Sequence, residues 1–282
     1  MVTETISDAE FSRIQQVMFE RVGVTIGSAK RALVVGRLSR RLRHFNLKSY
    51  TEYLKLVERQ GSEGEWQVMM DLLTTHETYF FREPKHFEFL NRVIKERSSR
   101  RETFRVWSAA CSSGEEAYSI AMTLADSAVS LDWQVFASDV SRRMVDESRQ
   151  GVYPQSRVAK VSPSVLERHF LRGVRSQAGN YLVSADLRKR MEFHQMNLNE
   201  NIDSEVGHFD FIFLRNVLIY FNAEQKKQIV KRLVAHLKYN GYLLVGHSET
   251  LNGVSDAVVA TAPSIYQRRS VASSQQVAGM NG

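Results

Sequence analysis

Two adjacent carboxylates, Glu115 and Glu116, stand at a position where many α/β proteins hold a ligand. They follow an apolar run at residues 105–109 and a turn of small residues at 110–114, and they precede a helical stretch. The turn between the first strand and its helix is where an open α/β sheet binds a nucleotide-like ligand. It lacks the G-x-G-x-x-G pattern that receives anionic phosphate, and two carboxylates would repel phosphate. They suit a cationic ligand, such as the amino and sulfonium groups of S-adenosylmethionine, although they could simply complement the helix dipole.

A third carboxylate, Asp139, ends the next apolar run, at residues 133–138. An acidic residue at the carboxyl end of this strand can accept hydrogen bonds from both hydroxyls of a ribose. An Asp after a strand can also be a plain turn residue. Taken together with Glu115 and Glu116, Asp139 favours a ligand that carries adenosine.

Short apolar runs separated by helical stretches dominate the chain after about Glu102. This alternation predicts a mostly parallel sheet with helices on its faces. The last two runs have no strong helix between them, so they should form an antiparallel edge pair. Residues 155–190 fit the alternation poorly, and the run at 180–183 predicts a hairpin inserted into the α/β domain. The predicted strands cover residues 103–109, 133–138, 191–196, 209–214, 242–245 and 264–268.

The first 75 residues have a different pattern. Apolar residues recur at helical spacing, as in Phe11, Ile14 and Met18, and this predicts a small all-helical domain. Ser7 and Glu10 have the spacing of a capping box, which predicts the start of the first helix. The predicted organisation is a helical domain at 1–75, a linker at 76–102, an α/β domain at 103–269 and a disordered tail at 270–282.

Composition excludes several other classes of protein. The 282 residues are 43% hydrophobic and 24% charged, which is typical of globular proteins. The single cysteine, Cys111, cannot form an intramolecular disulfide. The chain begins without a signal peptide pattern, and no run approaches the roughly 18 apolar residues of a membrane span, so we expect a cytoplasmic protein. The histidines lack metal-binding spacing, so no metal site is expected.

The net charge of +7 is concentrated in one stretch. Between Gly23 and Thr51 there is no acidic residue among several lysines and arginines. On a predicted helix at 30–45, apolar side chains share one face. The charges could form a solvated face of this helix, or they could form a binding surface for an acidic partner. The lack of neighbouring acidic residues favours the binding surface. The candidate binding residues are Arg37, Arg40, Arg41 and Arg43.

Four stretches carry a resemblance to a known family. They are residues 73–82 (LTTHETYFFR), 105–116 (RVWSAACSSGEE), 209–221 (FDFIFLRNVLIYF) and 246–249 (GHSE). In this order they resemble the chemotaxis receptor glutamate methyltransferases of the CheR type, over nearly the whole chain. The resemblance implies a class I S-adenosylmethionine-dependent methyltransferase domain, Rossmann-like α/β, with a small β-subdomain inserted at about 155–190. It also implies that the all-α domain in front of it binds the receptor.

The resemblance further implies a map of the site. The linker would fold over the cofactor as a lid, Asp139 would bind the ribose, and Arg82 and Tyr220 would be the catalytic residues that orient the reaction. S-adenosyl-L-methionine would be the cofactor and S-adenosyl-L-homocysteine its product. The implied cofactor contacts are His76, Thr78, Arg82, Glu116, Asp139, Asn197, Leu198, Arg215 and Asn216, with Asn197 and Leu198 beside the adenine and Arg215 and Asn216 beneath the methyl group.

Two positions depart from the family pattern. His76 stands where the family usually has Asn, and Ala117 stands where Pro is usual. An imidazole can still donate or accept one hydrogen bond, but its shape and charge differ from those of an amide. Pro at a first helical turn helps without being required, so Ala117 should be tolerated.

The chemistry explains why no catalytic triad is evident. A glutamate side chain, with an ordinary pKa of about 4.3, is already ionised at neutral pH and needs no general base. The site has to align the carboxylate with the methyl group and exclude water. Arg82 and Tyr220 suit this task, although Tyr220 could instead be a core aromatic.

The resemblance also implies the partners. They are the cytoplasmic methylation helices of methyl-accepting chemotaxis receptors, to whose membrane arrays the enzyme would be recruited as a monomer. Whether the insertion binds a C-terminal receptor tether peptide is left open. Two rivals are a nucleic-acid methyltransferase and an adaptor without catalytic activity. The first usually has Asn/Asp-Pro-Pro-Tyr or Phe after the fourth strand, unlike residues 215–220 here, and intact Arg82, Asp139 and Tyr220 argue against the second.

Overall fold

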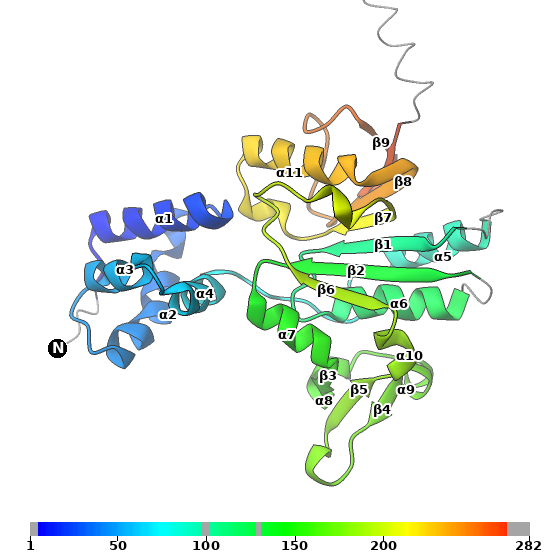
Figure 1. Cartoon of the computed structure of the whole chain (residues 1–282), viewed down its shortest axis with the longest axis horizontal. Helices are drawn as coiled ribbons and strands as arrows, with labels where there is room; N and C mark the ends of the chain where they lie inside the picture. The colour runs from blue at the N-terminus through cyan, green and yellow to red at the C-terminus, as the bar shows by residue number, and fades with distance from the viewer. Residues whose placement is uncertain (1–4, 97–101, 128–130, 270–282) are drawn as a thin grey trace, which may run out of the picture.

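The computed structural model describes residues 5–96, 102–127 and 131–269. The predicted disordered tail at 270–282 lies outside these ranges. Within them, an all-helical domain precedes an α/β domain that carries a small second sheet (Figure 1). The predicted fold class is confirmed. No helix of the described residues is long and apolar enough to cross a membrane.

In the described residues, four α-helices and a short 3-10 helix form the helical domain. The predicted capping box is present, since Glu10 N–H donates to Ser7 Oγ and Ser7 N–H donates to the Glu10 carboxylate. Apolar side chains at helical spacing meet in a separate core that includes Ile14, Met18 and Leu38. The elements are α1 (Asp8–Val22), η1 (Ser28–Lys30), α2 (Arg31–His44), α3 (Tyr50–Glu58) and α4 (Glu63–Leu73).

The main sheet is mostly parallel, as predicted, with strand order β6-β2-β1-β7-β8-β10-β9 in the described chain. The central strand β1 (Phe104–Ala109) pairs in parallel with β2 (Trp133–Asp139) and with β7 (Phe209–Leu214). β6 (Met191–Gln195) and β8 (Leu237–Val245) continue the sheet in parallel on either side. The strand order reverses at β1, so a ligand crevice is expected beyond the carboxyl ends of β1, β2 and β7.

The far edge of the sheet differs in part from the prediction. β10 (Ile265–Arg268) pairs antiparallel with β8, as expected. A further strand, β9 (Val258–Ala262), pairs with β10 and had no counterpart in the sequence prediction. Only Val258 of β9 is buried, so the alternation of apolar and polar residues that marks a strand is weak there.

Helices cover both faces of the sheet (Figure 1). α6 (Glu115–Ser127) and α7 (Arg142–Gln150) pack on one face, and α11 (Ala223–Ala235) packs on the other. α5 (Lys85–Glu96), in the predicted linker, packs against α6 through Phe87, Leu90 and Ile94. The second half of the linker therefore belongs to the core of the α/β domain, and residues 74–84 make the crossing between domains.

The insertion after α7 is a three-stranded antiparallel sheet, β3-β5-β4. Its middle strand, β5 (Asn180–Val183), is the run that suggested a hairpin in the sequence. The remaining elements of the insertion are β3 (Val152–Pro154), α8 (Gln155–Val158), α9 (Pro163–His169), β4 (Phe170–Arg172), η2 (Arg175–Gln177) and α10 (Ala185–Arg188).

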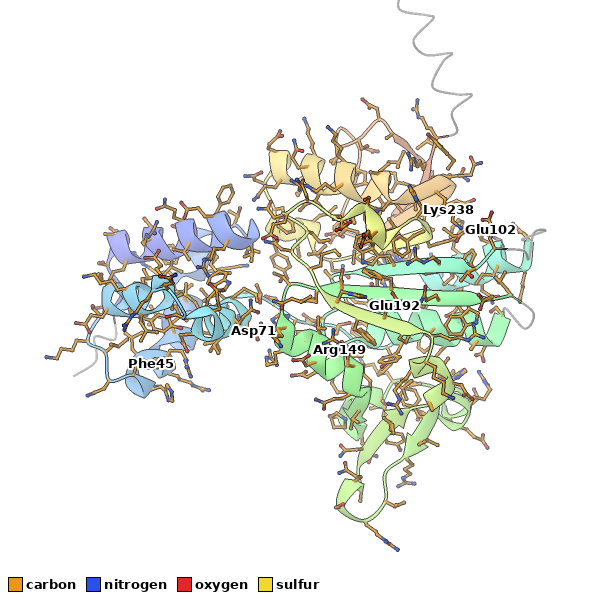
Figure 2. All side chains as sticks on the ribbon, viewed as in Figure 1. Phe45, Asp71, Glu102, Arg149, Glu192 and Lys238 are labelled. Carbon is orange, nitrogen blue, oxygen red and sulfur yellow. The ribbon has the colours of Figure 1, made fainter. Side chains whose placement is uncertain are left out.

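Direct contacts join the helical domain to the α/β domain. Gly23, at the end of α1, has φ +75°, and a Cβ there would lie 2.7 Å from Gln225 Nε2 of α11. Thr25 N–H donates to the carbonyl of Tyr220 at 2.9 Å. Arg143 Nε of α7 lies 3.0 Å from the carboxylate of Asp71, which Figure 2 places at the domain junction.

Candidate active site

One cavity lies at the junction of the two domains, over the carboxyl ends of β1, β2 and β7. It contains about 1100 Å³ of empty space, solvent at its mouth included. Val22, Val24, Ile26 and Lys30 of the helical domain form part of its wall. All the residues predicted to contact the cofactor line it, together with Tyr220: His76, Thr78, Arg82, Glu116, Asp139, Asn197, Leu198, Arg215 and Asn216.

The turn after β1 is held by its backbone. The N–H groups of Ala110 and Cys111 both donate to Ser138 O at 2.8 Å, which fixes the turn to the end of β2. Gly114 has φ +94°, and a Cβ there would lie 2.8 Å from Ser148 Oγ, so no larger residue fits. The turn therefore starts α6 beneath the cavity in one fixed direction.

Asp139 is buried at the end of β2, as the sequence predicted. One carboxylate oxygen accepts the N–H of Ser112 at 2.8 Å and the other accepts the N–H of Ser141 at 2.9 Å. Burial raises the pKa of Asp139 above its usual value, and these two hydrogen bonds and the nearby His76 offset only part of that increase. Each oxygen keeps a lone pair free. Asp139 can therefore still accept hydrogen bonds from the two hydroxyls of a ribose.

The two carboxylates at the start of α6 have different roles. Glu116 lines the cavity, but Glu115 is fully buried elsewhere. Glu115 accepts a hydrogen bond from Ser113 Oγ and forms an ion pair with Arg157 of the insertion. The proposal that both carboxylates face a cationic ligand is therefore wrong for Glu115, whose charge Arg157 already neutralises.

Arg215 joins three parts of the site. Its buried guanidinium binds Glu83 of the linker at 3.0 Å and Glu116 of α6 at 2.9 Å, and it also donates to the carbonyl of Arg82. Burial raises the pKa of Glu116 although Arg215 opposes the shift. For Glu83 the effect of burial is outweighed by Arg215, Asn216 and the His247 N–H, and the pKa is lowered. Two carboxylates facing one guanidinium leave a net negative charge in the floor, which suits a cationic sulfonium.

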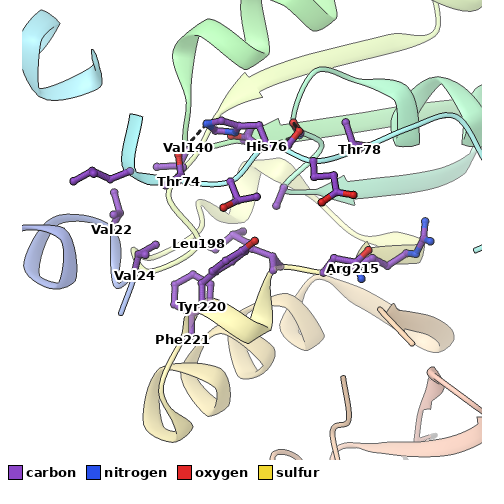
Figure 3. A pocket seen from close by; sticks show the side chains of 18 of the residues that line it. Val22, Val24, Thr74, His76, Thr78, Val140, Leu198, Arg215, Tyr220 and Phe221 are labelled. Atoms are coloured by element: carbon purple, nitrogen blue, oxygen red, sulfur yellow. Dashed lines mark hydrogen bonds between the residues drawn. The ribbon is translucent and has the colours of Figure 1, made fainter. Parts of the chain in front are cut away.

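The linker crosses the cavity with His76 and Thr78 along it (Figure 3), and Arg82 lines the same cavity. His76 Nε2 lies 2.9 Å from Thr74 Oγ1, and the carbonyl of His76 accepts a hydrogen bond from Ser112 Oγ at 3.0 Å. The guanidinium of Arg82 donates to the carbonyl of Glu77 at 2.9 Å. The linker is thus fixed to the first turn of the α/β domain by its backbone, and the replacement of Asn by His at 76 leaves that attachment intact.

The segment after β6 contributes Asn197 and Leu198. The side-chain amide of Asn197 donates to Arg21 O of α1 at 2.7 Å and to Glu200 at 2.8 Å, and its oxygen accepts the N–H of Asn199. Asn197 therefore also fastens the helical domain to the cavity. Leu198 is buried and presents an apolar surface suited to the face of a base.

Tyr220 belongs to η4 (Leu218–Tyr220) and lies between Val24 and Arg215 in the view of Figure 3. The loop that carries it is held by Glu249, whose carboxylate accepts the N–H groups of Asn216 at 2.8 Å and Ile219 at 3.3 Å. Glu249 and Glu83 were not predicted as site residues. The GHSE motif was the only signal for Glu249, and it gives no indication of this contact.

The four arginines predicted to bind an acidic partner divide into two pairs. Arg37 donates to the carbonyls of Leu72 at 2.7 Å and Thr74 at 3.0 Å, and Arg41 forms an ion pair with Glu65. Arg40 and Arg43 are exposed. No acidic residue lies near α2 in the sequence, but Glu65 of α4, which comes later in the chain, lies beside Arg41 in the folded protein.

Three potential metal ligands, Glu83, His86 and His247, lie within 4.8 Å of one another, although no sequence motif indicated them. Glu83 is already paired with Arg215. Burial, reinforced by the charge of Arg215, lowers the pKa of His86 to about 4.

The strand order, the acidic residue at the end of β2 and the cavity over the first turn define a class: the chain is a class I S-adenosylmethionine-dependent methyltransferase. When bound, the cofactor supplies a methyl group activated on a sulfonium. The residues present fit it, since Asp139 has free lone pairs for the ribose and the floor carries net negative charge.

The chain belongs to the CheR methyltransferase family. Residues 9–74 match the CheR methyltransferase all-alpha domain and residues 76–265 match its SAM binding domain. Over 93% of this chain and 91% of the relative, it is 39% identical to the chemotaxis protein methyltransferase of Escherichia coli K12. It is 41% identical to that of Salmonella typhimurium LT2, over 88% and 86%. Chemotaxis protein methyltransferase 2 of Pseudomonas aeruginosa PAO1 is 38% identical, over 91% and 92%.

Proposed function

We propose that the protein transfers a methyl group from S-adenosylmethionine to glutamate side chains in the cytoplasmic methylation helices of chemotaxis receptors. The products are glutamate methyl esters and S-adenosylhomocysteine, and the reaction serves sensory adaptation. The observation that carries the proposal is the cavity at the domain junction, which brings Asp139 and Glu116 together with Arg82 and Tyr220. The family of the chain supports the receptor as the substrate.

A carboxylate acceptor suits the chemistry of this cavity. A lone pair on the ionised glutamate oxygen forms the new O–C bond while the C–S bond breaks, and the electron pair of that bond stays on sulfur. No proton has to be removed, because a glutamate with an ordinary pKa of about 4.3 is ionised at neutral pH. Arg82 and Tyr220 hold the acceptor in line, and the linker and the helical domain exclude water.

The proposed receptor-binding surface contains two of the four arginines that the sequence suggested. Arg40 and Arg43 are exposed and can bind the acidic methylation helices. Arg37 and Arg41 stabilise the helical domain and the start of the linker. The matched test is Arg40→Glu with Arg43→Glu, which should reduce receptor methylation at least tenfold while cofactor affinity stays unchanged. If calorimetry shows equal loss of cofactor affinity, this surface is not dedicated to the receptor.

The insertion offers a second receptor contact. Leu171 is 59% exposed on the outer strand β4, and Val174 is 72% exposed just beyond it. Exposed apolar side chains beside an open strand edge suit an extended peptide. This supports binding of a C-terminal receptor tether at the insertion, which would help to recruit the enzyme to receptor arrays. Calorimetric titration with the last residues of a receptor from the same genome tests this, and Leu171→Glu should abolish the heat of binding.

The substrate assignment is tested by methylation of receptor-containing membranes with labelled S-adenosylmethionine. The label should enter receptor bands and be released as methanol by mild alkali, because carboxylate esters hydrolyse readily in base. Stable label on protein would contradict the glutamate assignment. Label on added nucleic acid would instead support the rival methyltransferase class.

A further inference from the structure

Among the described residues, three lysine and arginine side chains line the cavity, and two of them already have polar partners. Arg215 faces Glu83 and Glu116 and is almost fully buried. The guanidinium of Arg82 donates to the carbonyl of Glu77. Lys30 is the third, and in the described part of the chain no carboxylate forms an ion pair with it. Its ammonium instead lies 5.3 Å from the centroid of the Tyr220 ring.

Lys30 is held in this place by the loop that precedes α2. It is the last residue of η1, and its N–H donates to Gly27 O at 2.9 Å. Thr25 of the same loop donates to the carbonyl of Tyr220 itself. Gln15 of α1 donates to the carbonyl of Ile26, which attaches the loop to the helical domain. The ammonium is therefore presented beside Tyr220 by a segment fixed to both domains.

A free ammonium at this place would stabilise the substrate carboxylate. The carboxylate has to leave water and enter a cavity lined by the carboxylates of Glu116 and Asp139, where Arg215 is already paired with Glu116 and with Glu83 of the linker. An anion that approaches other anions in a partly buried site is disfavoured unless a cation compensates it. A lysine ammonium is compact and mobile enough to follow one carboxylate oxygen while the other is methylated.

We propose that the ammonium of Lys30 binds the carboxylate of the glutamate to be methylated and holds it beside the ring of Tyr220. This inference rests on the proposed function and adds a determinant of specificity to it. The ion pair forms with an ionised glutamate but not with a neutral glutamine. It is also lost when the ester forms, because the negative charge disappears, and this favours release of the product.

The test compares three variants in steady-state methylation of a cytoplasmic receptor fragment. Lys30→Met keeps the unbranched stem without the charge, Lys30→Arg keeps the charge, and Lys55→Met removes an exposed lysine of α3 that does not line the cavity. We expect Lys30→Met to lower kcat/KM about tenfold through KM, and Lys30→Arg to restore at least half of the loss. Lys55→Met should change kcat/KM less than twofold.

Binding provides a second measurement that does not depend on turnover. With S-adenosylhomocysteine present, the native protein should bind the receptor fragment that carries glutamate at its methylation sites more tightly than a variant fragment that carries glutamine at those sites. Lys30→Met should remove this difference and leave cofactor affinity within twofold. An unchanged difference overturns the inference, and so does an equal loss of cofactor affinity, which would assign Lys30 to the cofactor. If the native protein does not methylate the fragment at all, the proposed function itself fails.

Discussion

Replacing Arg215 by methionine should expose how the site balances its buried charges. In the native protein, Glu83 and Glu116 share the guanidinium of Arg215, whose side chain is only 1% exposed. Methionine fills a similar volume without the charge. Both carboxylates then face each other without a counter-charge, and the carbonyl of Arg82 also loses its donor.

The size of the effect follows from the two ion pairs. Removing one partner of a buried ion pair costs about 3–5 kcal/mol, because the remaining charge stays buried and uncompensated. Burial already raises the pKa of Glu116 with Arg215 present, and loss of the Arg215 charge, which opposes that shift, should raise this pKa further. The folded variant then binds more protons than the unfolded chain, so its stability increases as the pH falls. The deficit of about 3–5 kcal/mol at pH 7.5 should shrink by about 1 kcal/mol at pH 5.5.

Urea unfolding at pH 7.5 and pH 5.5 measures both effects. Arg40→Met is the matched control, because this exposed arginine should change the free energy of unfolding by less than about 0.5 kcal/mol. Adding Glu83→Gln to Arg215→Met removes one of the two unpaired charges and should recover about 1–2 kcal/mol. A deficit below about 1 kcal/mol, or the same deficit at both pH values, would refute the charge balance described here.

Three further changes test other parts of the site. Asp139→Ala should abolish S-adenosylmethionine binding in calorimetry, and retained affinity would exclude Asp139 as the ribose acceptor. A Cβ at Gly246 would lie 2.4 Å from Asn216 Nδ2, so Gly246→Ala should lower kcat at least tenfold in a methylation assay, and normal turnover would show that the loop can shift. The pKa of His86 is about 4 in the folded protein and about 6.5 in the unfolded chain, so the unfolded chain binds a proton first as the pH falls. The free energy of unfolding should therefore decrease between about pH 6.5 and pH 4, by up to about 3 kcal/mol. His86→Phe should remove this part of the pH dependence in urea unfolding, and an unchanged profile would assign it to other groups.

Local patterns sufficed for most strands of the main sheet and for one wall of the site. The runs that became β1, β2 and β7 are strongly apolar, and Asp139 follows one of them directly, so its place could be read from the sequence. β9 was missed because only one of its residues is buried. The linker residues His76, Thr78 and Arg82 were identified through the resemblance, since no periodicity marks them as site residues.

The errors and omissions have physical causes. Glu115 and Glu116 are adjacent on a helix, where successive side chains point about 100° apart, so only one of them could face the cavity. Glu83 and Lys30 were missed because their partners, Arg215 and Tyr220, lie far away in the chain. A contact that only tertiary structure creates leaves no spacing signal in the sequence.

The shared wall of the cavity also limits how this protein can be recombined. Exchanging the helical domain at residue 75 for that of another family member would replace Val22, Val24 and Lys30 in the cavity. It would also require a glycine that fits against Gln225, as Gly23 does. We therefore expect chimaeras made at this boundary to lose turnover as well as receptor choice. Because the proposed receptor-binding residues Arg40 and Arg43 lie on the exposed surface of α2, single substitutions there should be a safer way to change the proposed receptor preference.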